Sequence, residues 1–398
     1  MDRTSATKEP SPSRETWAFV LVVFGLSRLL FLVSGALAAA YLPQAEPGGD
    51  PLEPPGFLNY WAHWDGAWYS QIATDGYGEK APASTAFFPL YPLLVRLGVA
   101  IGGGPALWGV LISLVSTFFA LFFVFRIAEK LYDVRAARAA TLALAFFPTA
   151  FFLNAVYTEA LFLALTAGTF WAAYVRRDLL LAGLLGALAA ATRNLGVLLL
   201  LPLFLEWLRH RREFGPRGLV ELALVPAGLL GYALFLWARF GDPLLFAAQQ
   251  SAYWGRELAS PVTTAAGAWR TAGEGAKYLL DPATLFLDTS AGPTLEASNA
   301  LNLAFLVFFL VLMGVGFGAL PPGLSIYTFV IVLLPVLTPS PSFPLMSLPR
   351  FVLGAFPVFL VLGYLLSKNR PALVIWLVLS SGLGVALTAL FTTWRWVA

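Results

Sequence analysis

Two aspartates and a histidine stand among aromatic residues in one stretch near the start of the chain. The stretch covers residues 59–92, NYWAHWDGAWYSQIATDGYGEKAPASTAFFPLYP, and it contains His63, Asp65 and Asp75. Aromatic rings pack against the faces of sugar rings, and a carboxylate can accept a proton from a hydroxyl group as a general base. These residue types together indicate a site that holds a sugar and moves a proton.

Asp65 lies at the aromatic centre of the stretch, directly after Trp64 and before a glycine. A partly apolar pocket desolvates a carboxylate and makes it a better base near neutral pH. The alternative is that Asp65 caps a helix, because Asp is a favoured N-cap residue. Asp75 precedes Gly76, and this pair favours a turn, although Asp75 and Trp64 are kept among the candidate substrate contacts.

Further polar residues interrupt apolar runs later in the chain. Glu159 follows Asn154 and Tyr157, and Arg193 separates two short apolar runs. An ionisable group in such a place is costly unless it lines a polar cavity or pairs with a partner. One interpretation is a mutual salt bridge between Glu159 and Arg193. The other is that Arg193 binds an anion such as a phosphate, which a guanidinium contacts through two hydrogen bonds.

For three other charged or titratable residues the sequence indicates a role less specifically. Arg350 is a second cation that could bind an anion or act as an anchor at the membrane interface. Arg395, between two tryptophans, is expected to be such an anchor, and His210 is expected to be solvated in a basic cluster. The segment 241–298 adds amides, aromatics and charges that suit a sugar or a headgroup, but as a weak signal: Gln249, Gln250, Tyr253, Trp254, Arg256 and Glu257.

Composition places these residues in a membrane protein. The chain has 398 residues, of which 59% are hydrophobic and 12% charged, whereas soluble domains have about 25% charged residues. There is no cysteine, which excludes disulfides and thiolate chemistry, and two histidines are too few for a histidine-rich metal site. The sequence has no basic patch for nucleic acid and no phosphate-binding glycine loop, so an ATP-driven transporter is excluded within this chain.

Apolar runs predict an all-α, polytopic transmembrane protein with about eleven spans. A further run at 89–102 contains Arg96 and is interpreted as an interfacial helix. The predicted spans are 17–42, 105–128, 137–152, 156–175, 179–192, 195–209, 219–240, 299–319, 324–338, 351–367 and 371–393.

Basic residues give the expected orientation. They cluster before the first span and after the second, fourth, sixth and tenth, which the positive-inside rule makes cytoplasmic. Residues 1–16 are then a disordered cytoplasmic tail, and residues 17–398 form one membrane domain. The opposite side receives the loops 43–86 and 241–298, together with Asn154, Glu159, Arg193 and Arg350. Polar residues from separate parts of the chain are therefore expected to meet on one face.

An ordered set of short motifs resembles a known family. The set comprises W-D and a following G-Y in the first loop, FFPLYP at 87–92, NAVYTEA at 154–160, ATRNLG at 191–196 and MSLPRF at 346–351. It resembles the GT-C membrane glycosyltransferases of the GPI mannosyltransferase II type (phosphatidylinositol-glycan class V), and the match runs over most of the chain. The resemblance implies a GT-C fold in a multi-pass protein, here of a bacterial plasma membrane, with its active site outside.

The same resemblance implies roles for the residues. Mannose would pass with inversion from a polyprenyl-phosphate-mannose to a lipid-linked acceptor, by an α-1,6 linkage in the GPI pathway. Asp65 would be the general base, Arg193 or Arg350 would stabilise the departing lipid phosphate, and Glu159, Asn154 and Tyr157 would position the sugar. No cofactor or metal is expected.

One position departs from the family, and one alternative stays open. His63 stands where the family is expected to have arginine, and it would contact phosphate only when protonated. Because bacteria lack GPI anchors, the acceptor could be a phosphoinositol-mannoside, a cell-wall glycolipid or a protein, and a partner subunit is compatible with the sequence. The alternative function is a flippase or transporter of lipid-linked sugars, for which internal repeats and charges at mid-membrane would be typical.

Overall fold

The structure, a computed structural model, describes residues 12–45, 58–78, 82–290 and 292–398. Helices and their connections account for these residues, without a strand among them. Most of the predicted tail at 1–16 lies outside the described residues. Residues 14–16 already belong to the first helix, so the tail was predicted too long at this end.

The first half of the chain forms two long helices, α1 and α4, and several shorter ones. Segment η4 is a π-helix, and the other η segments are 3₁₀ helices. In chain order the elements are α1 (Arg14–Tyr41), η1 (Asn59–Trp61), α2 (Asp65–Asp75), η2 (Pro82–Ala86), α3 (Leu90–Val99), α4 (Pro105–Leu131), α5 (Val134–Ala145), η3 (Ala150–Leu153), α6 (Glu159–Phe170), η4 (Trp171–Arg176), α7 (Leu179–Thr192), η5 (Asn194–Leu199) and α8 (Leu200–Arg209).

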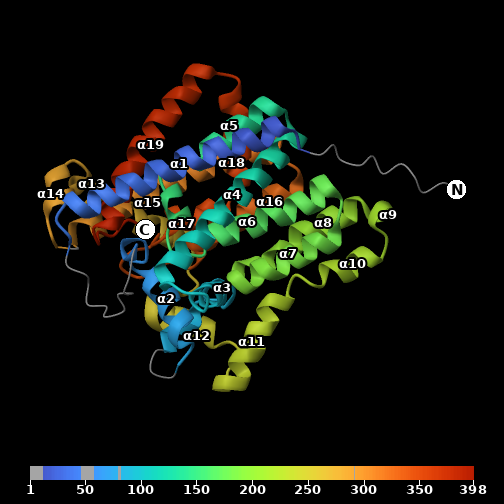
Figure 1. Cartoon of the computed structure of the whole chain (residues 1–398), viewed down its shortest axis with the longest axis horizontal. Coiled ribbons are helices and arrows are strands. Elements are labelled where there is room, and N and C mark those ends of the chain that lie inside the picture. Colours follow the sequence, from blue (N-terminus) through green and yellow to red (C-terminus); the bar gives the residue numbers. More distant parts are fainter. Residues whose placement is uncertain (1–11, 46–57, 79–81, 291) are drawn as a thin grey trace.

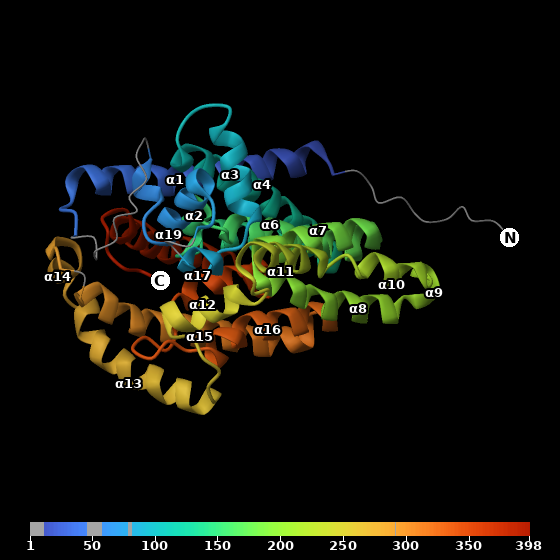
Figure 2. The same ribbon diagram turned by 90° about the horizontal axis from the view of Figure 1, so that it is seen from below.

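The second half contains two further long helices, α15 and α19. Its elements are α9 (Arg211–Phe214), α10 (Arg217–Leu222), α11 (Ala227–Phe240), α12 (Leu245–Trp254), α13 (Pro261–Leu279), α14 (Pro282–Leu287), α15 (Gly292–Ala319), α16 (Pro322–Leu337), α17 (Leu348–Phe351), η6 (Val352–Gly354), α18 (Pro357–Ser367) and α19 (Arg370–Thr392). Figures 1 and 2 show α14 at one end of the molecule and α9 at the other, with α13 packed along α15.

Local sequence explains where many helices begin. The side chains of Ser13, Asp133, Asp178 and Asn369 accept hydrogen bonds from backbone N–H groups in the first turns of α1, α5, α7 and α19. These side chains satisfy donors that the helix itself leaves free. Helices α4 and α16 instead have proline in the first turn, where no N–H is needed.

Four helices of the described residues are long and apolar enough to cross a membrane, namely α1, α4, α15 and α19. The number rises to six if each of two bent pairs counts as one span: α11 with α12, bent by 82°, and α17–η6 with α18, bent by 81°. The chain is therefore a multi-pass membrane protein, and the count of eleven spans stays a prediction. The runs at 137–152, 195–209 and 219–240 are each divided between two elements.

The two predicted outer loops contain helices. Segment 43–86 includes α2, and segment 241–298 includes α12, α13 and α14. The interfacial helix predicted at 89–102 corresponds to α3, which ends at Val99.

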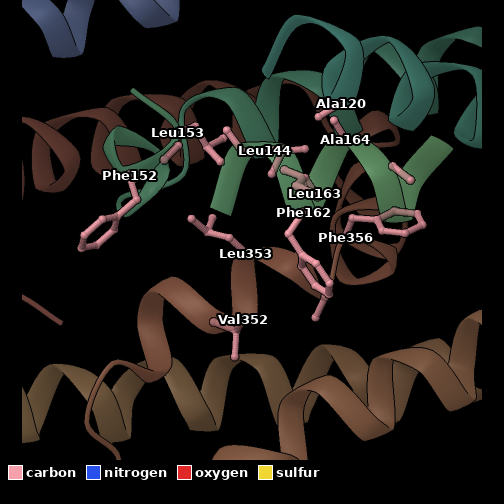
Figure 3. Close-up of a cluster of buried hydrophobic side chains, with 14 of the residues drawn as sticks. Ala120, Leu144, Phe152, Leu153, Phe162, Leu163, Ala164, Val352, Leu353 and Phe356 are labelled. Carbon is pink, nitrogen blue, oxygen red and sulfur yellow. The ribbon is translucent and has the colours of Figure 1, made fainter. Parts of the chain in front are cut away.

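A buried apolar cluster joins the helices that carry the polar residues. Figure 3 shows Phe162 and Leu163 of α6 in one cluster with Leu144 of α5 and Val352 and Leu353 of η6. Helix α18 approaches α5 so closely that a Cβ added to Gly363 would lie 2.4 Å from the backbone nitrogen of Ala140. Close packing of this kind resists deformation. It fixes the position of α17, just before η6, relative to the start of α6.

Candidate active site

Asp65 is the first residue of α2, and its backbone position is fixed from two sides. Trp64 has φ +57°, an uncommon conformation for a residue with a side chain. The Tyr157 hydroxyl donates to the His63 carbonyl at 2.9 Å, and the Val156 N–H donates to the Trp61 carbonyl at 2.9 Å. The Asp65 carboxylate is directed at another part of the chain, where it pairs with an arginine of α17 rather than capping α2.

Two acids and two arginines from distant chain positions form an alternating series. Arg350 Nη2 lies 2.5 Å from Asp65 Oδ2, and Arg350 Nε lies 3.9 Å from Glu159 Oε1. Arg193 Nη1 lies 3.2 Å from the same Glu159 oxygen. The salt bridge predicted between Glu159 and Arg193 is therefore present, and it extends to Asp65 through Arg350.

Arg350 is not an interfacial anchor. It is only 6% exposed, its Nη2 donates to the Ser347 hydroxyl at 3.2 Å, and its guanidinium lies 5.2 Å from the ring centroid of Tyr157. Arginine at an interface extends towards water, whereas a buried arginine needs hydrogen-bonding or charged partners inside the protein. Asp65 and Glu159 are those partners.

The series borders a cavity of about 330 Å³. Asp65, Arg193 and Arg350 line it, while Glu159 is buried behind the two arginines and is not part of the lining. Aromatic, amide and hydroxyl side chains form much of the remaining wall: Tyr69, Phe87, Phe88, Trp254, Phe351, Asn194, Gln250, Thr192, Thr338 and Ser347. The cavity therefore combines a carboxylate, guanidinium groups and aromatic faces.

A third arginine, Arg256, lines the same cavity. Its guanidinium donates to the carbonyls of Thr338 at 3.3 Å and Met346 at 3.0 Å, and no salt bridge joins it to a carboxylate within the described ranges. Burial, together with the nearby charges of Arg350 and Arg193, lowers the pKa of Arg256 to about 10. Positive charge that is poorly compensated in a cavity wall favours the binding of an anion.

From the sequence, Arg256 was only one of several residues of the segment 241–298 that weakly indicated a site for a sugar or a lipid headgroup. The residue directly follows Gly255 and the amide and aromatic residues of α12. Its position near two other arginines in the cavity wall depends on how α12 packs, which no local pattern reveals.

Three predicted contact residues support the site without lining the cavity. The His63 ring stacks on Trp394 with centroids 3.8 Å apart, and its Nδ1 lies 3.2 Å from the Phe391 carbonyl oxygen. Burial lowers the pKa of His63 to about 4, so the ring is neutral at physiological pH. Trp64 packs edge-on against Trp394 and Trp396. Tyr157 holds the turn before Asp65 through its hydroxyl.

Two other predicted residues lie further from the chemistry. Asp75 is exposed at the last position of α2, where Gly76 follows with φ +81°, as the predicted turn requires. Asn154 is buried, and its Oδ1 accepts a hydrogen bond from Arg28 Nη1 at 2.8 Å. Arg28 also donates to the carbonyls of Ala150 and Ala145. This arginine was missed, although a charge in the middle of the first apolar run was a visible signal.

Two expectations about cations are wrong. Arg395 is fully buried, and its guanidinium donates to the carbonyls of Pro43 and Asp288, each at 2.8 Å. It therefore ties the end of the chain to two other segments and is no interfacial anchor. His210 is not simply solvated, because its Nδ1 lies 3.0 Å from Glu206 Oε1.

Comparison with protein families gives one match. Residues 82–243 match the model described as dolichyl-phosphate-mannose-protein mannosyltransferase. The matched part is less than half of the chain, and it includes Glu159 and Arg193 but neither Asp65 nor Arg350. A search of curated proteins found no match.

Solved structures are similar to this chain at low sequence identity. ArnT from Cupriavidus metallidurans bound to undecaprenyl phosphate is 14% identical, with a TM-score of 0.53 over 93% of this chain and 63% of that chain. An oligosaccharyltransferase from Archaeoglobus fulgidus, in complex with Zn and sulfate, is 14% identical with a TM-score of 0.47 over 93% of this chain and 53% of its own. The chain thus spans less than two thirds of the ArnT chain, and it has the predicted all-α GT-C fold.

Proposed function

We propose that this chain is an inverting glycosyltransferase that moves a sugar from a polyprenyl-phosphate donor to a hydroxyl group of an acceptor. The observation that carries the proposal is the shared cavity in which the Asp65 carboxylate meets Arg193, Arg256 and Arg350. A carboxylate can remove the acceptor proton, and arginines can stabilise charge that develops on a phosphate.

The acceptor, the donor, Asp65 and the arginines account for every bond, proton and charge of the reaction. The acceptor oxygen forms a bond to the anomeric carbon of the sugar, and its proton passes to Asp65. The bond between the anomeric carbon and the phosphate oxygen breaks, and its electron pair stays on the phosphate. The lipid phosphate so released carries one more negative charge than it had in the donor, and the arginines offset that charge. A single displacement inverts the anomeric centre.

Arg350 links the two halves of this reaction. It pairs with Asp65 through Nη2 at 2.5 Å. A donor phosphate beside Arg350 competes for the same guanidinium and weakens its hold on the carboxylate. The donor therefore prepares Asp65 to accept the proton.

The aromatic and amide wall of the cavity suits the sugar. Tyr69, Phe87 and Trp254 offer ring faces and edges, and Gln250 and Asn194 offer hydrogen-bond donors and acceptors. Sugars are bound by this combination because their rings have apolar faces and polar rims.

The comparisons support a lipid-phosphate donor. The matched family is named for dolichyl-phosphate-mannose, and the ArnT structure contains undecaprenyl phosphate. The finer proposal is that the sugar is mannose, that no metal takes part, and that an α-1,6 linkage forms to a GPI-like or phosphoinositol-like lipid outside a bacterial plasma membrane. It rests on the resemblance of the ordered motifs between Trp64 and Phe351.

The experiment that tests the reaction class measures sugar transfer by the purified protein in lipid nanodiscs. Radiolabelled polyprenyl-phosphate sugars, mannose first, are supplied with membrane lipids, and labelled lipid products are separated. We expect labelled product with at least one donor. No product with any sugar of the donor panel, together with movement of intact donor across vesicle membranes, would contradict the proposal and favour a flippase.

A further inference from the structure

A second polar cavity, of about 200 Å³, lies where α4, η4 and α8 end and α15 connects to α16. It is at the end of the molecule that carries α9, away from α2 and α17 (Figure 1). Its charged and titratable lining residues are Lys130, Arg177, Glu206, Arg209 and His210. None of them takes part in the proposed transfer.

The one carboxylate of this lining already has partners. Glu206 is 3% exposed, and its Oε1 lies 2.6 Å from Arg177 Nη1 and 3.0 Å from His210 Nδ1. Arg177 Nη2 lies 3.2 Å from His210 Nε2. Because arginine can only donate, Nε2 accepts and the proton is on Nδ1, so His210 is neutral in this arrangement. Arg177 therefore balances the charge of Glu206, and its Nε also lies 3.9 Å from Oε1 of Glu213, which is outside the lining.

The other two cations are not balanced. Lys130 and Arg209 have no carboxylate within salt-bridge distance in the part of the chain that the structure describes. The lining thus has three cations for one carboxylate. Cations near helix C-termini stabilise the helix dipole, which explains their presence at the ends of α4 and α8. That effect does not explain a cavity between them.

Three local features point to a ligand independently of charge. The wall includes part of η4, a π-helix, and such helices are rare and are often found at functional sites. Arg177 follows it with φ +57°, a left-handed conformation that is unfavourable for arginine. The Tyr174 hydroxyl of η4 is buried against the cavity beside the Glu206 carboxylate, and within the described residues its geometry completes no hydrogen bond. A buried hydroxyl without a partner is costly, and a bound oxyanion would satisfy it.

We propose that this cavity binds a phosphate group. Lys130, Arg177 and Arg209 supply the positive charge, and Tyr174 donates a hydrogen bond to a phosphate oxygen. Apolar residues in the same wall, among them Ile127 and Leu131, suit the glycerol and acyl carbons next to the phosphate of an anionic lipid. The same phosphate chemistry could come from a soluble phosphate ester. The inference does not depend on the transfer reaction.

The test measures binding to the full-length protein, purified and freed of lipid in detergent, by native mass spectrometry. One arm uses short-chain phosphatidylglycerol against phosphatidylcholine, and the other uses glycerol phosphate and inorganic phosphate. The cavity variant is Lys130→Gln with Arg209→Gln. Its matched control is Arg211→Gln with Arg212→Gln, which removes two exposed charges from the same basic segment and outside the cavity. Tyr174→Phe removes only the hydroxyl.

We expect the cavity variant to weaken binding of the phosphate ligand at least about tenfold, and the control to leave it within about twofold. Tyr174→Phe should weaken binding without a change of net charge. Binding in the phosphatidylglycerol arm alone identifies a lipid headgroup, and binding of glycerol phosphate identifies a soluble ester. Absence of binding in both arms, or an equal loss in the control, would overturn the proposal.

Discussion

Arg350 and Asp65 form a salt bridge of 2.5 Å between α17 and the first residue of α2, two elements from opposite halves of the sequence. The side chain of Arg350 is 7% exposed, and the side chain of Asp65 is 19% exposed. The pair therefore joins a buried cation to a carboxylate that reaches the cavity. Arg350 thus has a structural role in addition to any contact with a donor phosphate.

The stability of the pair can be measured with a double-mutant cycle of Asp65→Asn and Arg350→Gln. Arg350→Gln leaves Asp65 without its partner and should lower the free energy of unfolding by about 3 kcal/mol. The two changes should be non-additive by at least about 1 kcal/mol, because each removes the same contact. Denaturant unfolding in detergent is the measurement, and additive effects would show that the two side chains do not interact.

Arg193 is predicted to stabilise the transition state more than the ground state. Arg193→Gln should lower kcat by about a hundredfold or more, because a preorganised cation at the departing phosphate is lost. Arg193→Lys should retain part of the rate, since lysine keeps the charge but not the fork of donors. Steady-state kinetics with varied donor measures both. Equal rates for Arg193→Gln and the wild type would mean that Arg193 only balances Glu159.

Arg256 is predicted to bind the lipid phosphate in both donor and product. Arg256→Gln should raise the KM for donor and the inhibition constant of polyprenyl phosphate together, by about tenfold. Arg270→Gln is the matched control, because Arg270 is exposed on α13 in the same outer segment. If both variants change these constants alike, general attraction by surface charge is the cause and Arg256 is not a ligand.

The lowered pKa of His63 predicts that the stability of the fold decreases at acidic pH. Its pKa is about 4 in the folded protein and about 6.5 in the unfolded chain, so between these values only the unfolded chain binds the proton. The free energy of unfolding should therefore fall by up to about 3 kcal/mol as the pH drops from 6.5 to 4.

The matched variant is His63→Phe, which keeps the stacking on Trp394 and removes the titration. Unfolding of both proteins is measured across this pH range. The variant should lose less stability than the wild type between pH 6.5 and 4. Parallel curves would assign the acid sensitivity to other groups.

The sequence predicted the site residues best where charged side chains lie in apolar surroundings. Glu159, Arg193 and Arg350 stood out because charges in apolar surroundings need partners, and the structure brings all three together. Their pairing with Asp65 could not be predicted, because spacing along a chain does not tell which distant elements meet. The bend between η6 and α18, inside the predicted run 351–367, was missed for a related reason, since windowed hydropathy averages over a change of direction.

The predictions for Arg395 and Arg256 fell short for a physical reason. Arg395 looks like an anchor because tryptophans flank it, yet the chain end folds inward and backbone carbonyls surround its guanidinium. Arg256 looks like an ordinary residue of a polar segment, yet the packing of α12 brings it into the cavity wall near two other arginines. In both cases tertiary packing decides the environment of a side chain whose local sequence suits the surface equally well.

The central claim is that Asp65 is the base that accepts the proton of the acceptor hydroxyl. The most direct measurement compares transfer from radiolabelled polyprenyl-phosphate-mannose by the wild type, by Asp65→Asn and by the exposed control Asp242→Asn, at matched amounts of folded protein. We predict a loss of at least about a hundredfold for Asp65→Asn and none for Asp242→Asn. Transfer by Asp65→Asn at the wild-type rate would contradict the claim and assign the base to another carboxylate.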